Sequence, residues 1–204
     1  WLGEWLPVFT DSSTPTNGYR VVYDLMQVTD REKTIAIHDA GGSRGYMTQF
    51  WVSTKPRNFV AMGGMAPMGW SMGAAIGAKL ARPDQLVVHL LGDASFGMTG
   101  MELETAVRMD APTLTIVINN GGIGGGVMGM ERPDGTPPAV ALLGGNFSQV
   151  ALGLGAYSER VEQPEEIAPA LRRAIHSTEE GKAALVEVMI KPMRTPDLPD
   201  DWSL

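Results

Sequence analysis

The chain has 204 residues, of which 44% are hydrophobic and 19% are charged, and it contains no cysteine. This length suits one sizeable domain, and the lack of cysteine excludes disulfides, thiolate metal sites and cysteine nucleophiles. The net charge of -7 argues against non-specific nucleic-acid binding. No apolar run approaches the ~20 residues of a membrane span, and the start does not resemble a signal peptide, so we expect a cytoplasmic protein without membrane contact.

The chain begins with a segment that does not look like part of a core. Residues 1–16 contain two prolines and a Thr/Ser cluster, which predicts a linker or an arm. The first residue is Trp1 rather than Met, so we expect the chain to be trimmed or part of a longer product. Asn17 is then predicted to cap a helix, because apolar residues follow at helical spacing as far as Met26.

Apolar runs and amphipathic segments alternate along the remainder of the chain. This alternation predicts βαβ units, and hence a doubly wound α/β fold with a mostly parallel sheet and helices on both faces. The predicted strands are 34–38, 59–61, 86–91, 114–118, 157–161 and 184–190, and the predicted helices after the first are 70–81, 100–109, 147–154 and 167–177. Ligands of such sheets bind at the carboxyl ends of the strands, so any site should be built from the three glycine-rich exits at 39–43, 92–97 and 119–126.

Two polar residues at these exits are candidates for a metal site. Asp93 follows one buried strand and Asn120 follows the next, and one strand-helix-strand unit places both at the same edge of the sheet. A carboxylate, an amide oxygen and a backbone carbonyl are ligands that Mg²⁺ accepts, usually completed by phosphate oxygens. A single acid at such a place is more often a helix cap or a turn residue, but its pairing with Asn120 favours a metal ligand.

These residues carry a resemblance to a known family. Gly92-Asp93 followed by Asn119-Asn120 is similar to the Gly-Asp-Gly…Asn-Asn signature of thiamine diphosphate-dependent enzymes of the acetolactate synthase and 2-oxo acid decarboxylase superfamily. Residues 17–190 resemble the diphosphate-binding domain of these enzymes, and 191–204 would be a tail that either covers the site or is a plain disordered end. Further segments stand in the family's order, namely Pro56-Arg57, Gly63-Gly64, 67–69 and 74–78. Residues 92–97, 100–105 and 119–123 look most like the oxalyl-CoA decarboxylase and 2-hydroxyacyl-CoA lyase branch.

The resemblance implies a role for individual residues. Mg²⁺ would be bound by the side chains of Asp93 and Asn120 and by the carbonyl of Gly122. Met68 would be the catalytic prop that keeps the cofactor bent, so that its pyrimidine amino group lies near the reactive carbon of the thiazolium ring. The implied cofactor-binding residues are Gly41, Gly42, Ser43, Ala66, Met68, Gly92, Asp93, Ala94, Ser95, Asn120, Gly122 and Ile123.

The sequence departs from the family pattern at three points. Ala94 replaces the third glycine of the signature, and we expect its small methyl group to be tolerated. Gly124 stands where the CoA-using branch has a tyrosine, which argues against decarboxylation of oxalyl-CoA. The family's activating Glu belongs to a separate pyrimidine-binding domain. We therefore expect that domain to come from a partner chain or from the missing part of the same polypeptide, in a homo- or hetero-oligomer.

The implied function is thiamine diphosphate- and Mg²⁺-dependent cleavage or formation of a carbon–carbon bond next to a carbonyl, with a 2-hydroxyacyl-CoA lyase favoured. A 2-oxo acid decarboxylase or an acetolactate synthase-type enzyme is the alternative. An alternative of another class is a non-catalytic partner subunit that retains the fold. Residues 122–126 also fit a loose dinucleotide fingerprint, which would leave Asp93 unexplained and lacks the acid expected ~20 residues later.

Other polar residues are open to two interpretations. His89 lies inside an apolar run and is predicted to be a core histidine, and His176 is predicted to be solvated. His38 ends a predicted strand and faces either the core or the cofactor. Glu131 and Arg132 either reach the substrate or lie in a solvated turn.

Overall fold

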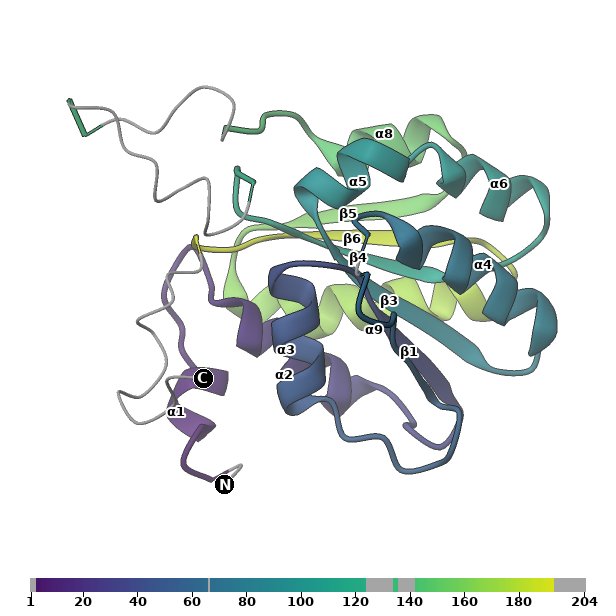
Figure 1. Ribbon diagram of the computed structural model, residues 1–204, viewed down its shortest axis with the longest axis horizontal. Helices are drawn as coiled ribbons and strands as arrows, with labels where there is room; N and C mark the ends of the chain where they lie inside the picture. The colour runs from purple at the N-terminus through teal and green to yellow at the C-terminus, as the bar shows by residue number, and fades with distance from the viewer. Residues whose placement is uncertain (1–2, 66, 124–133, 136–141, 193–204) are drawn as a thin grey trace.

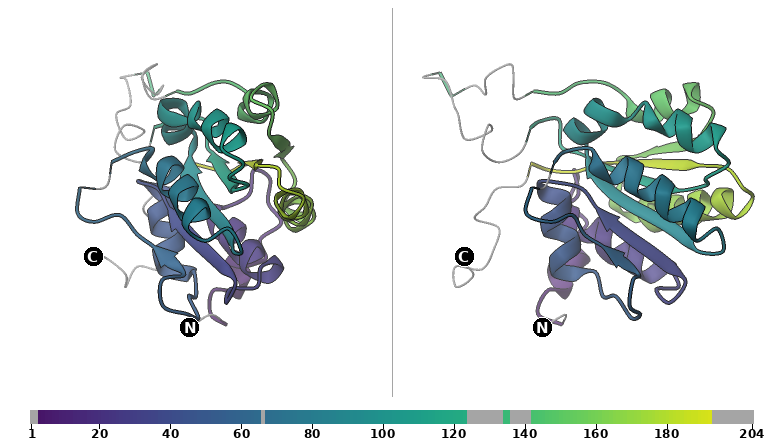
Figure 2. Two further views of the ribbon diagram at one scale, coloured as in Figure 1. Left: turned by 90° about the vertical axis from the view of Figure 1, so that its right-hand side faces the viewer. Right: turned by 45° about the vertical axis from the view of Figure 1, so that its right-hand side comes forward.

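The computed structural model describes residues 3–65, 67–123, 134–135 and 142–192. Its centre is a six-stranded sheet in the order β2-β1-β3-β4-β6-β5, and every strand pair is parallel. Helices cover both faces of this sheet (Figure 1; Figure 2). The predicted doubly wound α/β fold is therefore confirmed. Within the described residues, no helix is long and apolar enough to cross a membrane.

All predicted strands and helices are present, with ends that shift by a few residues. The strands are β1 Thr34–His38, β2 Phe59–Val60, β3 Leu86–Gly92, β4 Leu114–Asn119, β5 Tyr157–Val161 and β6 Ala184–Met189. The predicted helices are α2 Gly18–Val28, α4 Trp70–Ala81, α6 Glu102–Arg108, α8 Phe147–Gly153 and α9 Ile167–Glu179, preceded by the short helix η2 Pro164–Glu166. As predicted, Asn17 caps α2, because its Oδ1 accepts a hydrogen bond from the Arg20 N–H at 2.9 Å.

Among the described residues, the structure has three α-helices that were not predicted, namely α1 Leu6–Phe9, α3 Gly42–Phe50 and α5 Asp93–Thr99, and the short helix η2 was not predicted either. Two of them, α3 and α5, begin inside glycine-rich exits that the sequence indicated as loops. Helix α5 starts directly after β3, and α3 starts four residues after the end of β1. The first backbone N–H groups of a helix have no backbone partner within that helix, so these two starts bring N–H donors to the edge where a ligand is expected. One of them, the Ala94 N–H, donates to the Asp93 carboxylate.

Residues 1–16 differ from the expectation that they add nothing to a core. Trp5 and Phe9 are buried, and their ring centroids lie 4.7 and 5.1 Å from that of Phe50. Trp5 also packs on Tyr19, at 5.4 Å between ring centroids. Buried aromatic pairs of this kind stabilise a fold through both area and geometry. The expectation is therefore wrong for Trp5 and Phe9.

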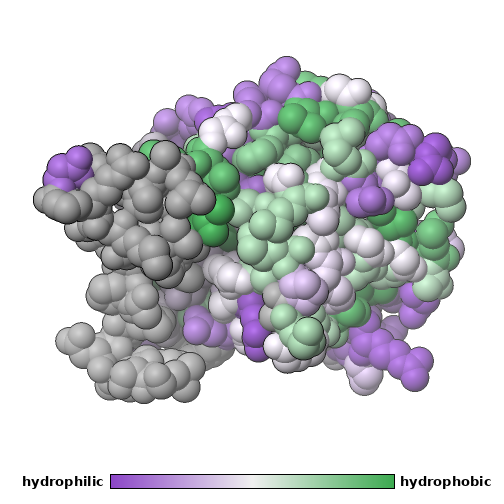
Figure 3. Space-filling model, turned by 45° about the horizontal axis from the view of Figure 1, so that its top comes forward, coloured by the Kyte–Doolittle hydropathy of each residue, from purple (hydrophilic) through white to green (hydrophobic). Residues whose placement is uncertain are grey.

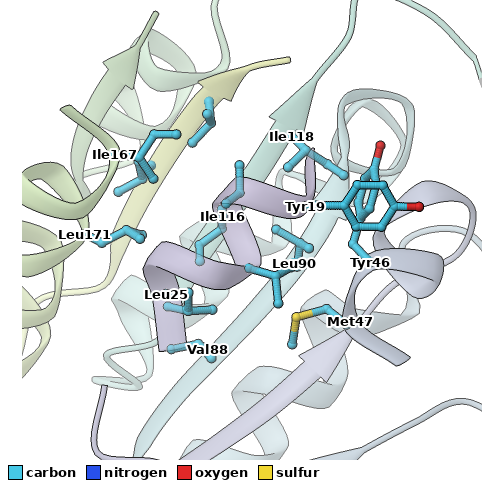
Figure 4. Close-up of a cluster of buried hydrophobic side chains, with 14 of the residues drawn as sticks. Tyr19, Leu25, Tyr46, Met47, Val88, Leu90, Ile116, Ile118, Ile167 and Leu171 are labelled. Carbon is cyan, nitrogen blue, oxygen red and sulfur yellow. The ribbon is translucent and has the colours of Figure 1, made fainter. Parts of the chain in front are cut away.

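Two layers of apolar side chains hold the helices to the sheet. On one face, α2, α3 and α9 pack against the strands, and Figure 4 shows Leu25, Met47 and Leu171 from these helices beside Leu90 and Ile116 of the central strands. On the other face, α4, α5, α6 and α8 pack on the alternate strand residues, among them Leu91, Val117 and Leu185. Because side chains alternate across a strand, both faces of the central strands are buried, which agrees with their continuous apolar sequences.

The strand register places three chain exits at one edge of the sheet. In the parallel pairing, His38 of β1 lies opposite Leu90 of β3, and Gly92 of β3 lies opposite Ile118 of β4. The chain leaves these neighbouring strands at Asp39, Asp93 and Asn120. The described parts of the three glycine-rich exits, 39–43, 92–97 and 119–123, therefore lie side by side and form the floor of the candidate site.

Candidate functional site

A cavity of about 250 Å³ lies between the exits of β1, β3 and β4. Eleven of the twelve predicted cofactor-binding residues line it, and the twelfth, Ala66, lies outside the described residues. The eleven are Gly41, Gly42, Ser43, Met68, Gly92, Asp93, Ala94, Ser95, Asn120, Gly122 and Ile123. The other described residues of the lining are Ala40, Tyr46, Ile118 and Ile190. The structure thus brings together segments that are far apart in the sequence.

A larger hollow of about 760 Å³ lies at the opposite, amino edge of the sheet. Its charged lining residues are of both signs, namely Asp30, Lys33, Lys79, Asp84 and Glu179. The ammonium of Lys79 already donates hydrogen bonds to the carbonyls of Pro83 at 3.0 Å and Gln85 at 2.7 Å. Ligands of parallel α/β sheets bind at the carboxyl edge. We therefore place the functional site in the smaller cavity.

Asp93 is the first residue of α5 and is 3% exposed. Its Oδ1 accepts a hydrogen bond from the Ala94 N–H at 2.8 Å, and its Oδ2 accepts one from the Gly122 N–H at 3.2 Å. Burial raises the pKa of the Asp93 carboxyl, although these backbone N–H groups act in the opposite direction. Because burial disfavours the ionised form, a nearby cation would stabilise the carboxylate strongly.

Asn120 reaches the same point from the end of β4. Its Oδ1 accepts a hydrogen bond from the Gly122 N–H at 3.1 Å, and this is the N–H that Asp93 Oδ2 contacts from the other side. The expected convergence of the two side chains is therefore present in the structure. Their role as ligands to a metal ion stays a prediction.

The donor set suits Mg²⁺ bound together with a ligand. Among the described residues, no group of three or more His, Cys, Asp or Glu side chains could hold a metal ion. The candidate set is instead one carboxylate, one amide oxygen and one backbone carbonyl, from Asp93, Asn120 and Gly122. Mg²⁺ is commonly held by one or two carboxylates plus the phosphate oxygens of its ligand. These residues therefore fit a metal ion that a diphosphate would help to bind, and the metal site itself stays a prediction.

Glycines leave space for that diphosphate. A Cβ added to Gly41 or Gly92 would meet no atom within 4 Å, so the space beside both backbones is open to a ligand. Gly41 precedes α3 with a φ of +67°, in the left-handed region that favours glycine. The free N–H groups at the start of α3 are suited to bind an anion. Ala94, which replaces the family's glycine, is buried with its methyl group at the cavity wall.

Asp39 fixes the segment that carries Met68, and sequence reasoning did not single it out. This fully buried residue accepts hydrogen bonds from the Gly69 N–H at 2.8 Å through Oδ1 and from the Ser71 N–H at 3.0 Å through Oδ2. Burial acts to raise the pKa of Asp39, but the hydrogen bonds from Gly69 and Ser71 outweigh it and hold that pKa below its ordinary value. Asp39 thereby ties the end of β1 to the start of α4.

The same segment is held from its other side by α5. The Thr99 hydroxyl contacts the Gly69 carbonyl at 3.2 Å. Gly69 has a φ of +86°, and a Cβ at this position would lie 2.4 Å from the Thr99 methyl group. Only glycine fits here without a shift, so the approach to α4 is fixed where Met68 enters the cavity wall.

Comparison with known proteins agrees with this geometry. The family described as "Thiamine pyrophosphate enzyme, C-terminal TPP binding domain" matches residues 39–188, which include the described cavity lining except Ile190. The chain belongs to this family. Thiamine pyrophosphate and thiamine diphosphate are two names for one molecule, so the superfamily named from the signature is confirmed, and the cofactors of this family are thiamine diphosphate and Mg²⁺.

Several curated relatives resemble this thiamine diphosphate-binding domain. A probable acetolactate synthase large subunit of Methanocaldococcus jannaschii is 31% identical over 194 residues, which cover 92% of this chain and 32% of the relative. An acetolactate synthase large subunit of Mycobacterium tuberculosis is 34% identical over 183 residues, which cover 89% of this chain and 33% of the relative. Mouse 2-hydroxyacyl-CoA lyase 1 is 30% identical over 199 residues, which cover 91% of this chain and 34% of the relative. The domain thus spans about a third of the length of these relatives.

The histidines of the domain lie away from the cavity wall. His89 is buried between the hydroxyls of Thr115 at 2.8 Å and Ser71 at 3.2 Å, so the prediction of a core histidine is confirmed. His38 is also buried, with Nδ1 2.9 Å from the Asp39 carbonyl oxygen, and it does not line the cavity. The structure thus gives no support to the interpretation that His38 faces the cofactor, which stays a prediction. His176 is exposed beside two glutamates, as predicted.

Like Ala66, several other residues with a predicted role lie outside the described residues. These are Gly124 and the rest of the segment 124–126, the pair Glu131 and Arg132, and the tail from residue 193 onward. Their roles stay predictions.

His89 makes the stability of the domain depend on pH. Burial lowers the pKa of this imidazole to about 4, whereas the unfolded chain has a His pKa of about 6.5. The unfolded state therefore binds the proton first, and the free energy of unfolding should fall by about 3 kcal/mol as the pH drops from above 6.5 to about 4. Urea unfolding at pH 7, 6 and 5 measures this slope. In His89→Gln the free energy of unfolding should change clearly less between pH 7 and pH 5. An unchanged dependence on pH would contradict the lowered pKa of His89.

Proposed function

We propose that the protein containing this domain makes or breaks a carbon–carbon bond next to a carbonyl, with thiamine diphosphate and Mg²⁺ as cofactors. The observation that carries the proposal is the meeting of Asp93 and Asn120 at the Gly122 N–H, 3.2 and 3.1 Å away, on the wall of a glycine-lined cavity. When bound, the cofactor supplies a nucleophilic carbon and an electron sink for the bond that breaks.

The residues of this chain would bind and orient the cofactor. The side chains of Asp93 and Asn120 and the carbonyl of Gly122 would hold Mg²⁺, whose positive charge compensates that of the diphosphate. Backbone groups at Gly41, Gly42 and Ser43 would contact the diphosphate from one side, and those at Ala94 and Ser95 from the other. Met68, held by the Asp39 and Thr99 contacts of its neighbour Gly69, would keep the cofactor bent.

The activating carboxylate must come from elsewhere. Among the described residues that line the cavity, Asp93 is the only acid, and it faces the proposed metal ion. The domain also spans only about a third of its relatives, so further polypeptide is expected to contribute. We propose that a pyrimidine-binding domain, from the same polypeptide or from a partner in a dimer or tetramer, supplies the Glu.

The surface of the domain carries several exposed apolar side chains. Four of them lie on or next to α5, α6 and α8, namely Met98, Met101, Val150 and Leu152. Figure 3 shows hydrophobic residues interspersed with polar ones over the described surface. Apolar side chains scattered in this way are common on protein surfaces, so the proposal of a partner domain rests on the missing carboxylate and on the length of the relatives.

For the substrate we favour 2-hydroxyacyl-CoA, with carbon–carbon cleavage. The segments at 100–105 and 119–123 support this choice, as does the likeness to mouse 2-hydroxyacyl-CoA lyase 1. A 2-oxo acid substrate, as in acetolactate synthesis, is the second candidate, because the Mycobacterium tuberculosis relative is 34% identical.

A substrate screen tests the proposal. The full-length protein, with thiamine diphosphate and Mg²⁺, is assayed against panels of 2-hydroxyacyl-CoA thioesters and 2-oxo acids. We expect turnover that requires both cofactors, and none from the 204-residue chain alone. Cofactor binding without turnover of either panel would favour a non-catalytic partner subunit, and NAD binding without Mg²⁺ would favour the dinucleotide interpretation.

A further inference from the structure

A buried carboxyl group on β6 has no part in the cofactor contacts described above. Glu187 is 0% exposed. Its Oε1 accepts hydrogen bonds from Asn119 Nδ2 at 2.7 Å and from Arg160 Nη1 at 3.4 Å, and its Oε2 accepts one from the Ser148 N–H at 2.9 Å. All three partners are N–H donors, which suits an acceptor-only carboxylate. Burying such a group is costly, and an apolar residue would continue the layer of Leu185 and Val117.

Glu187 decides which way the amide of Asn119 points. A carboxylate can only accept, so the NH₂ group of Asn119 must face it. The Oδ1 of Asn119 then faces the turn that follows β4, where it accepts the Gly121 N–H at 2.9 Å. A reversed amide would set one oxygen against the carboxylate and an NH₂ group against the Gly121 N–H.

The strand register explains why the two side chains meet. Glu187 lies opposite Val117 in the pairing of β4 with β6, and Asn119 is two residues further along β4. Residues two apart in a strand point to the same face, so Asn119 and Glu187 lie on the same face of the sheet. Glu187 also holds the first turn of α8 through Ser148, so the end of β4 is fixed to a neighbouring helix.

The turn held by Asn119 carries the proposed metal ligands. Gly121 has a φ of +71°, which brings the next N–H, that of Gly122, between the side chains of Asp93 and Asn120. If Asn119 no longer held the Gly121 N–H, the Asn120 side chain and the Gly122 carbonyl would lose their fixed places. Glu187 is thus connected to the proposed ligands through the Asn119 side chain and the backbone turn at Gly121.

We infer that Glu187 is a positioning residue for the metal site. Through Asn119 it holds residues 119–122 in the conformation that presents the Asn120 oxygen and the Gly122 carbonyl to Mg²⁺. The inference rests on the function proposed above, and Glu187 itself does not touch the ion. Replacing hydrogen-bond partners of metal ligands typically weakens metal affinity 10–100-fold.

The test uses Glu187→Gln in the full-length protein. An amide of the same size carries one acceptor oxygen and one donor group, so in either orientation it opposes a donor to Asn119 Nδ2 or to the Ser148 N–H. Mg²⁺ is titrated calorimetrically at saturating thiamine diphosphate, and Mn²⁺ binding is followed by electron paramagnetic resonance. We expect the Kd of both ions to rise at least 10-fold. Thermal unfolding monitors the fold of each variant.

Two further variants separate positioning from a general structural effect. Arg160→Gln removes another partner of the same carboxylate but leaves Asn119 in place, and its metal affinity should stay within about 3-fold of the unmodified protein. Asn119→Ala should weaken the metal about as much as Glu187→Gln, and the double variant should be little worse than either, because both act on one path. Asn119→Ala also tests the inference if Glu187→Gln fails to fold.

The outcomes distinguish this inference from the proposed function. Glu187→Gln or Asn119→Ala with unchanged metal affinity, or additive losses in the double variant, would overturn the positioning role. An unmodified protein that binds neither ion with thiamine diphosphate would instead overturn the proposed function.

Discussion

Asp93→Ala is expected to abolish the Mg²⁺-dependent binding of thiamine diphosphate. Among the described residues, Asp93 provides the only carboxylate on the cavity wall, and its loss leaves the ion with neutral oxygens from the chain. Changes in the surroundings of metal ligands already weaken binding 10–100-fold, so loss of a direct ligand should weaken it at least ~100-fold. Calorimetric titration of the full-length protein with thiamine diphosphate, with and without Mg²⁺, measures the effect.

A matched control removes one negative charge at a position away from the cavity. Asp84 is an acid at the opposite edge of the sheet with a side chain that is 70% exposed, paired with Arg82 on the surface. Exposed pairs contribute little to stability, so Asp84→Ala should bind the cofactor like the unmodified protein. Equal affinities of Asp93→Ala and Asp84→Ala would mean that Asp93 is not a metal ligand.

The largest loss of stability is expected for Asp39→Ala. The substitution leaves the N–H groups of Ala40, Gly69 and Ser71 without their carboxylate acceptor. Each buried, unpaired N–H costs about 1–3 kcal/mol, and the N–H groups of Gly69 and Ser71 are buried, so the free energy of unfolding should fall by about 2–6 kcal/mol. Urea unfolding at pH 7 measures the loss. Asp39→Asn, which keeps one acceptor oxygen, should lose less, and a loss under about 1 kcal/mol for Asp39→Ala would contradict the assigned contacts.

Asp39 should also affect how the stability of the domain changes in acid. Because its hydrogen bonds hold the pKa of Asp39 below the ordinary 3.8, its stabilising effect is complete above that pH and disappears as the pH falls through the lower, folded-state value. Stability measured between pH 4 and 2 should therefore fall more steeply in the unmodified protein than in Asp39→Ala.

Most of the fold could be predicted because its signals are local. Apolar runs and helical periodicity identified each strand of the described sheet and five of the described helices. Helix α3 does carry such a signal, since Ser43, Tyr46, Met47 and Phe50 are buried at helical spacing, but three glycines in and before it favoured a loop. Helix α5 is only 7 residues long and has one large buried side chain, Phe96, so no periodicity could appear.

The site was predictable where its residues stand at strand ends in a known spacing. Asp93, Asn120 and the flanking glycines were found in this way. Asp39 and Glu187 were missed because their partners are distant in the sequence. Asp39 accepts a backbone N–H 30 residues away, and Glu187 accepts a side-chain amide 68 residues away. No pattern of neighbouring residues reveals such contacts. A single acid inside the apolar strand Ala184–Met189 was the one available signal for Glu187.

The most direct measurement is a crystal structure of the full-length protein with thiamine diphosphate and Mg²⁺. It should show one octahedral ion about 2.1 Å from an Asp93 carboxylate oxygen, Asn120 Oδ1 and the Gly122 carbonyl oxygen, with diphosphate oxygens among the remaining ligands. A bound diphosphate whose metal ion touches neither Asp93 nor Asn120 would contradict the account.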